Sequence, residues 1–176
     1  AVSLVLVAPL CLAAGVLVGR GHPGGPVLAL GPATYTAYMF VQYLVGPGYE
    51  RYPTVLTFHL ALFVLGGCVA VGAWTRVAAD ELPGMSERGR RAWSWVLIGL
   101  AAFVFSRYLP ALAGSADGVA LTKEFRAEPA FFWTIFVMDV GVVVPSAIAA
   151  ALALRRAAPV GVKATYAIVG WFALVP

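Results

Sequence analysis

Long apolar stretches separated by short polar loops dominate the chain and predict membrane-spanning helices. A helix that crosses the hydrocarbon core of a bilayer needs about 20 mostly apolar residues. Five stretches approach this length and a sixth is cut off by the end of the sequence; they cover residues 2–19, 27–46, 53–74, 92–112, 129–154 and 164–176. We therefore predict an all-α, polytopic transmembrane helix bundle, with five complete spans, a truncated sixth, and a single integral membrane domain over residues 1–176.

Proline and glycine mark the boundaries of these stretches. Gly46-Pro47-Gly48 is a strong helix stop, and Pro53 and Pro129 suit the first turn of a helix. Gly31-Pro32 interrupts the second stretch, which favours a kink over a discontinuous helix that lines a binding site. Because the chain starts without methionine and stops inside an apolar stretch, we expect both ends of a longer protein to be missing.

Basic residues in the loops predict the orientation. Short cytoplasmic loops are enriched in lysine and arginine. The first, third and fifth loops (20–26, 75–91 and 155–163) hold eight basic residues, whereas the second and fourth hold three. The odd-numbered loops should therefore be cytoplasmic and the N-terminus outside, and we expect the membrane to be the inner membrane of a bacterium.

Composition supports a membrane protein and removes several classes. Hydrophobic residues make up 61% of the chain and charged residues 11%, which excludes a disordered chain and a soluble enzyme of usual composition. The net charge is +4, but the basic residues are scattered over short loops, so no nucleic-acid partner is expected. The expected partners are the lipid bilayer and other membrane subunits. Cys11 and Cys68 lie in apolar stretches and are predicted to be small buried hydrophobes.

Three ionisable residues lie inside predicted spans, where charge is costly and usually faces the bundle interior. His59 and Arg107 should lie roughly 8–9 Å below the outer boundary, and Asp139 roughly 15 Å below it, at 1.5 Å per helical residue. Because consecutive antiparallel spans are usually neighbours, we predict an ion pair between Arg107 and Asp139. Such a pair either fixes helix packing or forms an ion, proton or anionic-ligand site. The remaining alternative is that Arg107 extends outward to the interface without a partner.

The second stretch carries a polar stripe. Tyr35, Tyr38, Gln42 and Tyr43 follow the spacing of one helical face. Hydrogen bonds between helices would satisfy these side chains, and a cavity for a small polar or quinone-like ligand is the alternative. The candidates for a ligand or ion pathway are thus Asp139, Arg107, His59, Gln42, Tyr35 and Tyr38.

Three classes of function remain open. A transporter or small-ligand or ion-binding protein explains the costly residues at similar depth, and we place it narrowly first. A non-catalytic accessory or assembly subunit of a larger membrane complex explains the short loops and the lack of catalytic motifs. A membrane-embedded enzyme acting on a lipid or quinone comes last, because no nucleophile or metal site can be assembled. Catalytic residues and cofactors remain unknown at this level.

Overall fold

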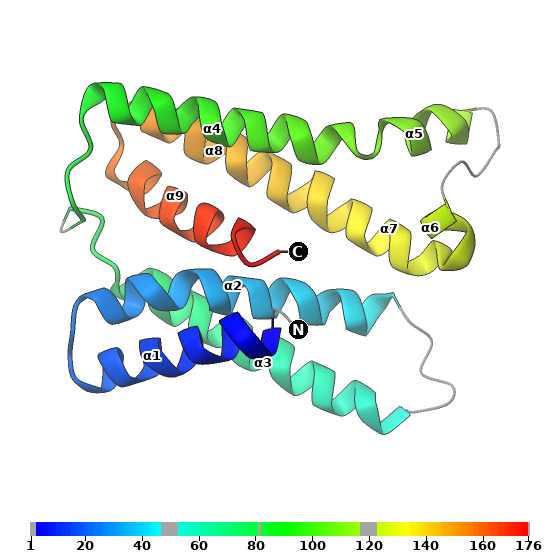
Figure 1. The fold of residues 1–176 in the computed structure, drawn as a ribbon, viewed down its shortest axis with the longest axis horizontal. Coiled ribbons are helices and arrows are strands. Elements are labelled where there is room, and N and C mark those ends of the chain that lie inside the picture. Colours follow the sequence, from blue (N-terminus) through cyan, green and yellow to red (C-terminus); the bar gives the residue numbers. More distant parts are fainter. Residues whose placement is uncertain (1–2, 47–52, 81, 117–122, 176) are drawn as a thin grey trace.

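The computed structural model describes residues 3–46, 53–80, 82–116 and 123–175, and all of their regular secondary structure is helical (Figure 1). In chain order the elements are the π-helix η1 (Ser3–Val7), α1 (Ala8–Gly19), α2 (Gly24–Val45), α3 (Pro53–Arg76), α4 (Glu87–Ser106), α5 (Leu109–Ala116), α6 (Lys123–Ala127), α7 (Pro129–Met138), the π-helix η2 (Asp139–Val143), α8 (Val144–Arg155) and α9 (Pro159–Phe172). The predicted all-α class is confirmed.

The prediction of five or six spans is wrong. Three helices in the described ranges are long and apolar enough to cross a bilayer: Thr54–Arg76, Glu87–Gly114 and Pro129–Arg155. The helix at Val5–Gly19 is apolar but shorter, and α9 has 14 residues. Although α2 has 22 residues, tyrosines, a glutamine, glycines and prolines interrupt its apolar sequence. The three long helices indicate an integral membrane protein.

Helix α2 lies at the centre of the bundle. It packs against α1, α3, α7 and α9, and Figure 1 shows α1 and α3 on one side of it and α9 on the other. Helices α4 and α8 form a second packed pair, and α9 lies between this pair and α2. Consistent with this central place, Leu30, Tyr35 and Gln42 are all buried. The helix continues without a break through Pro32.

Two tight helical turns of the same kind connect α1 to α2 and α8 to α9. At the end of α1, Gly21 adopts φ +67° and the next amide, of His22, donates to the Leu17 carbonyl at 2.9 Å. At the end of α8, Ala157 adopts φ +56° and the amide of Ala158 donates to Ala153 at 3.0 Å. This is the Schellman arrangement, which reverses the chain at once and usually has glycine at the left-handed position.

Small residues allow helices to approach closely. A Cβ atom on Gly31 of α2 would lie 2.9 Å from the carbonyl carbon of Gly170 on α9. Beyond each tight turn, Gly25 and Gly161 lie similarly close to the backbone at the end of the preceding helix. Such small-residue contacts are a common basis of helix packing in membranes, where lipid gives helices no hydrophobic reason to associate.

The long helix α7–α8 contains the π-helix η2 because Pro145 interrupts its hydrogen-bond ladder. Proline has no amide hydrogen to donate to the carbonyl four residues earlier, at Gly141. The amide of Val144 instead bonds the Asp139 carbonyl, five residues back. π-turns of this type are often found at functional sites, and this one begins at the buried acid of the helix.

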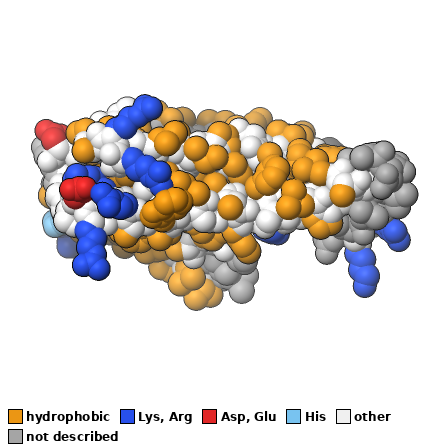
Figure 2. Space-filling view, turned by 90° about the horizontal axis from the view of Figure 1, so that it is seen from above, with side chains coloured by type: hydrophobic (Ala, Val, Ile, Leu, Met, Phe, Trp, Pro, Cys, Tyr) orange, Lys and Arg blue, Asp and Glu red, His pale blue; other side chains and the backbone are white. Residues whose placement is uncertain are grey.

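The connections α1–α2, α3–α4 and α8–α9 meet at one end of the bundle (Figure 1). Figure 2 shows Lys and Arg side chains at both ends of a face whose middle is covered by hydrophobic side chains, with the larger group on the left. This agrees with the grouping of basic loops in the sequence, although their cytoplasmic location stays a prediction. The last of these loops is shorter than predicted: Lys163 lies within α9 and is buried, with its ammonium nitrogen 4.4 Å from the Trp74 ring centroid.

Replacing Ala157 with glycine should stabilise the protein by about 1 kcal/mol, because a left-handed backbone costs an L-residue about 1–2 kcal/mol. The matched change Gly21→Ala in the equivalent turn should lower stability by a similar amount. Thermal unfolding in detergent micelles measures both. A lower unfolding midpoint for Ala157→Gly would contradict this account of the turn.

The change Gly31→Ala should destabilise the protein by about 1–3 kcal/mol, because the new methyl group meets the backbone of α9. At Gly67 of α3, nothing lies within 4 Å of an added Cβ. Gly67→Ala should therefore stabilise by up to about 1 kcal/mol through helix propensity. Opposite shifts of the unfolding midpoint are expected, and equal shifts would show that Gly31 has no special packing role.

Candidate functional site

The carboxylate of Asp139 forms a polar centre within the bundle. The side chain is only 4% exposed, and both carboxylate oxygens accept hydrogen bonds. Tyr38 of α2 donates its hydroxyl to one oxygen, and Tyr108, in the turn between α4 and α5, donates to the other at 2.5 Å. One acid thereby connects three segments of the chain that are separate in sequence.

Aromatic rings enclose this centre. Tyr38 meets the edge of Trp171 at 4.9 Å between ring centroids, and Tyr108 meets Phe136 at 5.1 Å. Gln42, one turn beyond Tyr38, is buried on the same face of α2. The indole nitrogen of Trp171 is buried and has no hydrogen-bond partner among the described residues. Since a buried polar group must find partners, the two tyrosine hydroxyls are what make this position tolerable for a carboxylate.

The predicted ion pair between Arg107 and Asp139 does not form. Arg107 is exposed, and the adjacent Tyr108 takes its place at the carboxylate. Helical phase explains the exchange, because the buried stripe of this helix runs through Leu97, Ala101, Val104 and Tyr108 at spacings of four, three and four residues. Arg107 lies off that stripe and is exposed, so it does not meet the buried carboxylate.

The other predicted residues divide among different environments. Tyr35 shares the buried face of α2 with Tyr38 and Gln42, and its hydroxyl pairs with Ser3 at 3.0 Å. His59 lies among the rings of Phe40, Tyr43 and Phe58, with the nearest ring centroid, that of Tyr43, at 5.4 Å. The stripe prediction therefore succeeded for Tyr35, Tyr38 and Gln42. A single pathway through His59, Arg107 and Asp139 is not what the side chains form.

A groove of about 600 Å³ opens on the opposite face of α2, between α1 and α3. Small and apolar side chains form most of its wall, including Ala14, Gly15, Ala29, Ala33 and Gly72. Helices α1 and α3 both pack on α2, and α3 has no other major packing partner among the described elements. Only 6% of the most apolar segment of α3 is buried inside the molecule. The groove thus faces the surroundings of the bundle.

Both cysteines line this groove from opposite walls, Cys11 on α1 and Cys68 on α3. They are exposed free thiols, so the prediction of small buried hydrophobes is wrong for both. At one end the groove also contains Arg76, the last residue of α3, which is exposed. Within the described residues, Arg76 has no ion pair and no hydrogen bond through its side chain.

The chemistry of these two regions differs. Asp139 is enclosed and lines neither this groove nor the pockets beside Arg155 and beside Ser146. In the ranges that the structure covers, no group of three or more His, Cys, Asp or Glu side chains is placed to hold a metal ion. The groove, in contrast, is open, apolar and carries one cationic side chain, a combination suited to holding a ligand rather than to proton transfer.

Sequence reasoning missed Tyr108 and Arg76. Tyr108 is recognisable from the spacing of the buried residues in its helix, once that helix is known to continue to Ser106. Arg76 resembles any basic residue at the end of a span, and no local signal separates it from the others. Comparison with protein-family models, curated proteins and solved structures finds no match for this chain.

The change Tyr108→Phe should destabilise the protein by about 2 kcal/mol, because it removes a charge-assisted hydrogen bond and leaves one carboxylate oxygen of Asp139 without a donor. Tyr166→Phe is the matched control, since Tyr166 is exposed on α9. Unfolding in detergent with increasing sodium dodecyl sulfate compares the two variants. Equal stability of both would show that the polar centre does not hold the helices together.

Proposed function

We propose that this membrane protein binds a small amphiphilic ligand taken from the bilayer, a long acyl chain with an anionic head group. The groove between α1, α2 and α3 is the binding site, and Arg76 is the residue that holds the head group. The single observation that carries this proposal is an open apolar groove that ends at an arginine without an ion-pairing partner in the described part of the chain. A non-catalytic binding role agrees with the absence of a recognisable catalytic motif from the sequence.

The size and lining of the groove support an acyl chain. Small-molecule sites commonly measure about 300–1,000 Å³ and are mostly apolar with few polar groups. The groove has a volume of about 600 Å³, and its polar or charged lining residues are limited to Thr36, the two cysteines and Arg76. Because lipid tails are as apolar as this wall, an acyl chain can enter sideways from the bilayer without loss of hydration.

Charge complementarity supports an anionic head. An arginine at the end of a membrane helix normally extends toward the interface, where its guanidinium meets water and lipid head groups. Its planar fork binds a carboxylate or phosphate through two parallel hydrogen bonds. Arg76 ends α3 and lines the groove at the same time, so a chain lying in the groove would bring its head group to this side chain.

The polar centre around Asp139 and the groove lie on opposite faces of α2. Tyr38 holds one face of α2 toward Asp139, and the opposite face presents Ala29, Pro32 and Ala33 to the groove. In this proposal Asp139 positions the wall of the site and does not contact the ligand. We also propose that the end of the bundle with the basic loops, including Arg76, faces the cytoplasm.

Photo-crosslinking tests the binding site. Purified protein in detergent is irradiated with a photoactivatable palmitic acid, and labelled peptides are identified by mass spectrometry. Label is expected on α1 and α3. Arg76→Gln should lower labelling by about tenfold, the effect of losing one charge-assisted partner. The methyl ester of the same probe should label wild type and Arg76→Gln equally.

Filling the groove gives an independent test with a matched control. Gly72 lines the groove and Gly67 does not, and a Cβ atom added at either position meets nothing within 4 Å. Gly72→Leu should abolish labelling, and should protect Cys68 from a membrane-permeable maleimide, while Gly67→Leu changes neither. Labelling that survives Gly72→Leu would overturn the proposal, as would a stoichiometric partner subunit that covers Cys11 and Cys68 in the native complex.

Movement of a proton or cation past Asp139 is a second candidate function. The observation that favours it is the π-helix that begins at this buried acid, because both features are frequent at functional sites in membranes. Asp139→Asn keeps the shape of the side chain and removes its charge. Loss of proton or cation flux in proteoliposomes with unchanged palmitate labelling would favour transport, whereas wild-type flux in Asp139→Asn would exclude it.

A further inference from the structure

A second pocket, of about 340 Å³, lies between the first turns of α4 and the end of α8. Its lining residues are Glu87, Arg90, Arg91, Trp95, Leu154 and Arg155, so it brings together three arginines and one glutamate. We propose that this pocket binds a phosphate group, supplied by the head group of an anionic phospholipid. None of its residues belongs to the groove between α1 and α3, so this inference does not rest on the proposed function.

Arg155 is already oriented for such a ligand. Its Nε–H donates to the Oγ atom of Ser94 at 2.8 Å, and Ser94 is completely buried. The guanidinium carbon lies 4.5 Å from the centroid of the Trp95 ring. These two contacts hold the plane of the guanidinium and leave its terminal Nη groups as donors. A guanidinium held in this way loses little entropy when it binds a phosphate in a two-pronged manner.

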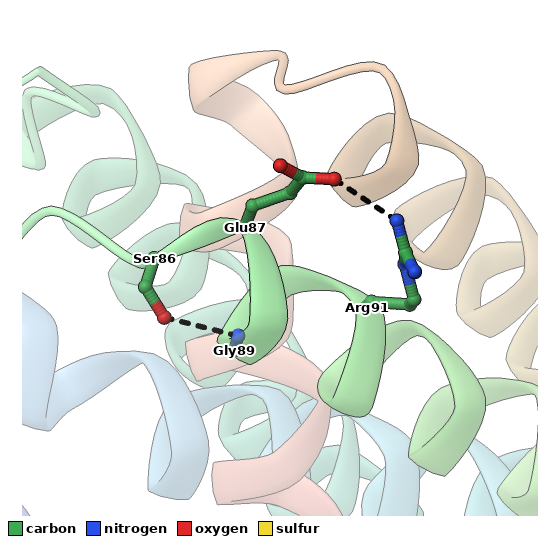
Figure 3. A network of polar contacts seen from close by, with 4 residues as sticks. All are labelled: Ser86, Glu87, Gly89 and Arg91. Atoms are coloured by element: carbon green, nitrogen blue, oxygen red, sulfur yellow. Dashed lines mark hydrogen bonds and ion pairs between the residues drawn. The ribbon is translucent and has the colours of Figure 1, made fainter.

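The two arginines of α4 complete the pocket from the other side. Arg90 is anchored through one Nη, which donates to the Met85 carbonyl at 2.8 Å. Arg91 pairs with Glu87 at 2.9 Å, as Figure 3 shows, and both side chains are more than two-thirds exposed. An exposed ion pair of this kind contributes little stability and is readily exchanged. A phosphate oxygen can therefore replace Glu87 as the partner of Arg91.

The location of the pocket favours a lipid-borne phosphate. Helices α4 and α8 lie within two of the three candidate spans, and the pocket lies where both meet the basic end of the bundle. Trp95 is exposed beside it, as is typical of residues at the level of the head groups. Basic pockets between membrane helices are common sites for anionic head groups, whose net negative charge a zwitterionic head group does not carry.

Native mass spectrometry of the purified, delipidated protein tests this inference. Phosphatidylglycerol is added at increasing concentration, with phosphatidylcholine as the neutral comparison and inorganic phosphate as the soluble competitor. The protein should retain phosphatidylglycerol in preference to phosphatidylcholine. Arg155→Gln should weaken retention by about tenfold. Arg156→Gln removes the same charge from the neighbouring residue, which does not line the pocket, and should leave retention unchanged.

A second variant separates binding from folding, because Arg155→Gln also removes the partner of Ser94. Arg91→Gln disturbs only an exposed pair and should weaken retention, while Arg88→Gln, on the same helix but outside the pocket, should not. Displacement of the lipid by millimolar inorganic phosphate would uphold the phosphate site and assign it to a soluble ligand. Equal losses in the pocket and control variants, or equal retention of the two lipids, would overturn the proposal.

Discussion

The hydrogen bonds that satisfy Asp139 set the arrangement of the bundle. A carboxylate removed from water is tolerated only where donors surround it, and lipid supplies none. Tyr38 and Tyr108 provide these donors from two other parts of the chain, which joins α2, the α4–α5 turn and the α7–α8 helix at one point. The π-helix η2 begins at this acid, in a helix whose backbone hydrogen bonds are interrupted by Pro145. Packing elsewhere must be compatible with this junction.

Helix α2 has two faces of different chemistry. Its polar side chains are directed to Asp139 and to the Trp171 cluster, where they are buried. Its small side chains meet α1 and α3 and leave the groove open between them. Hydrogen bonds therefore close one side of the central helix, and small residues keep the other side accessible. The same small-residue principle brings α9 close to α2 at Gly31 and Gly170.

Sequence patterns were reliable where one helix decides the outcome. The apolar stretches, the helix stops and the shared face of Tyr35, Tyr38 and Gln42 depend on local periodicity, and the structure has them. The number of spans was overestimated because an apolar stretch does not always form a helix long and apolar enough to cross a bilayer. It can also form a shorter helix or one that packs inside the bundle. Arg107 was assigned to Asp139 from its predicted depth and from the expected contact between consecutive spans, although the direction of a side chain also depends on helical phase.

The sequence by itself determined an apolar α-helical chain with few charges, with most of its basic residues in or near three connections and one acid deep in an apolar stretch. Only the tertiary structure decided that tyrosines rather than an arginine satisfy this acid, that both cysteines face a groove, and that Arg90, Arg91 and Arg155 line one pocket. The physical reason is that helix periodicity is a property of neighbouring residues. Which faces meet depends instead on close approaches and hydrogen bonds between helices that lie far apart in the chain.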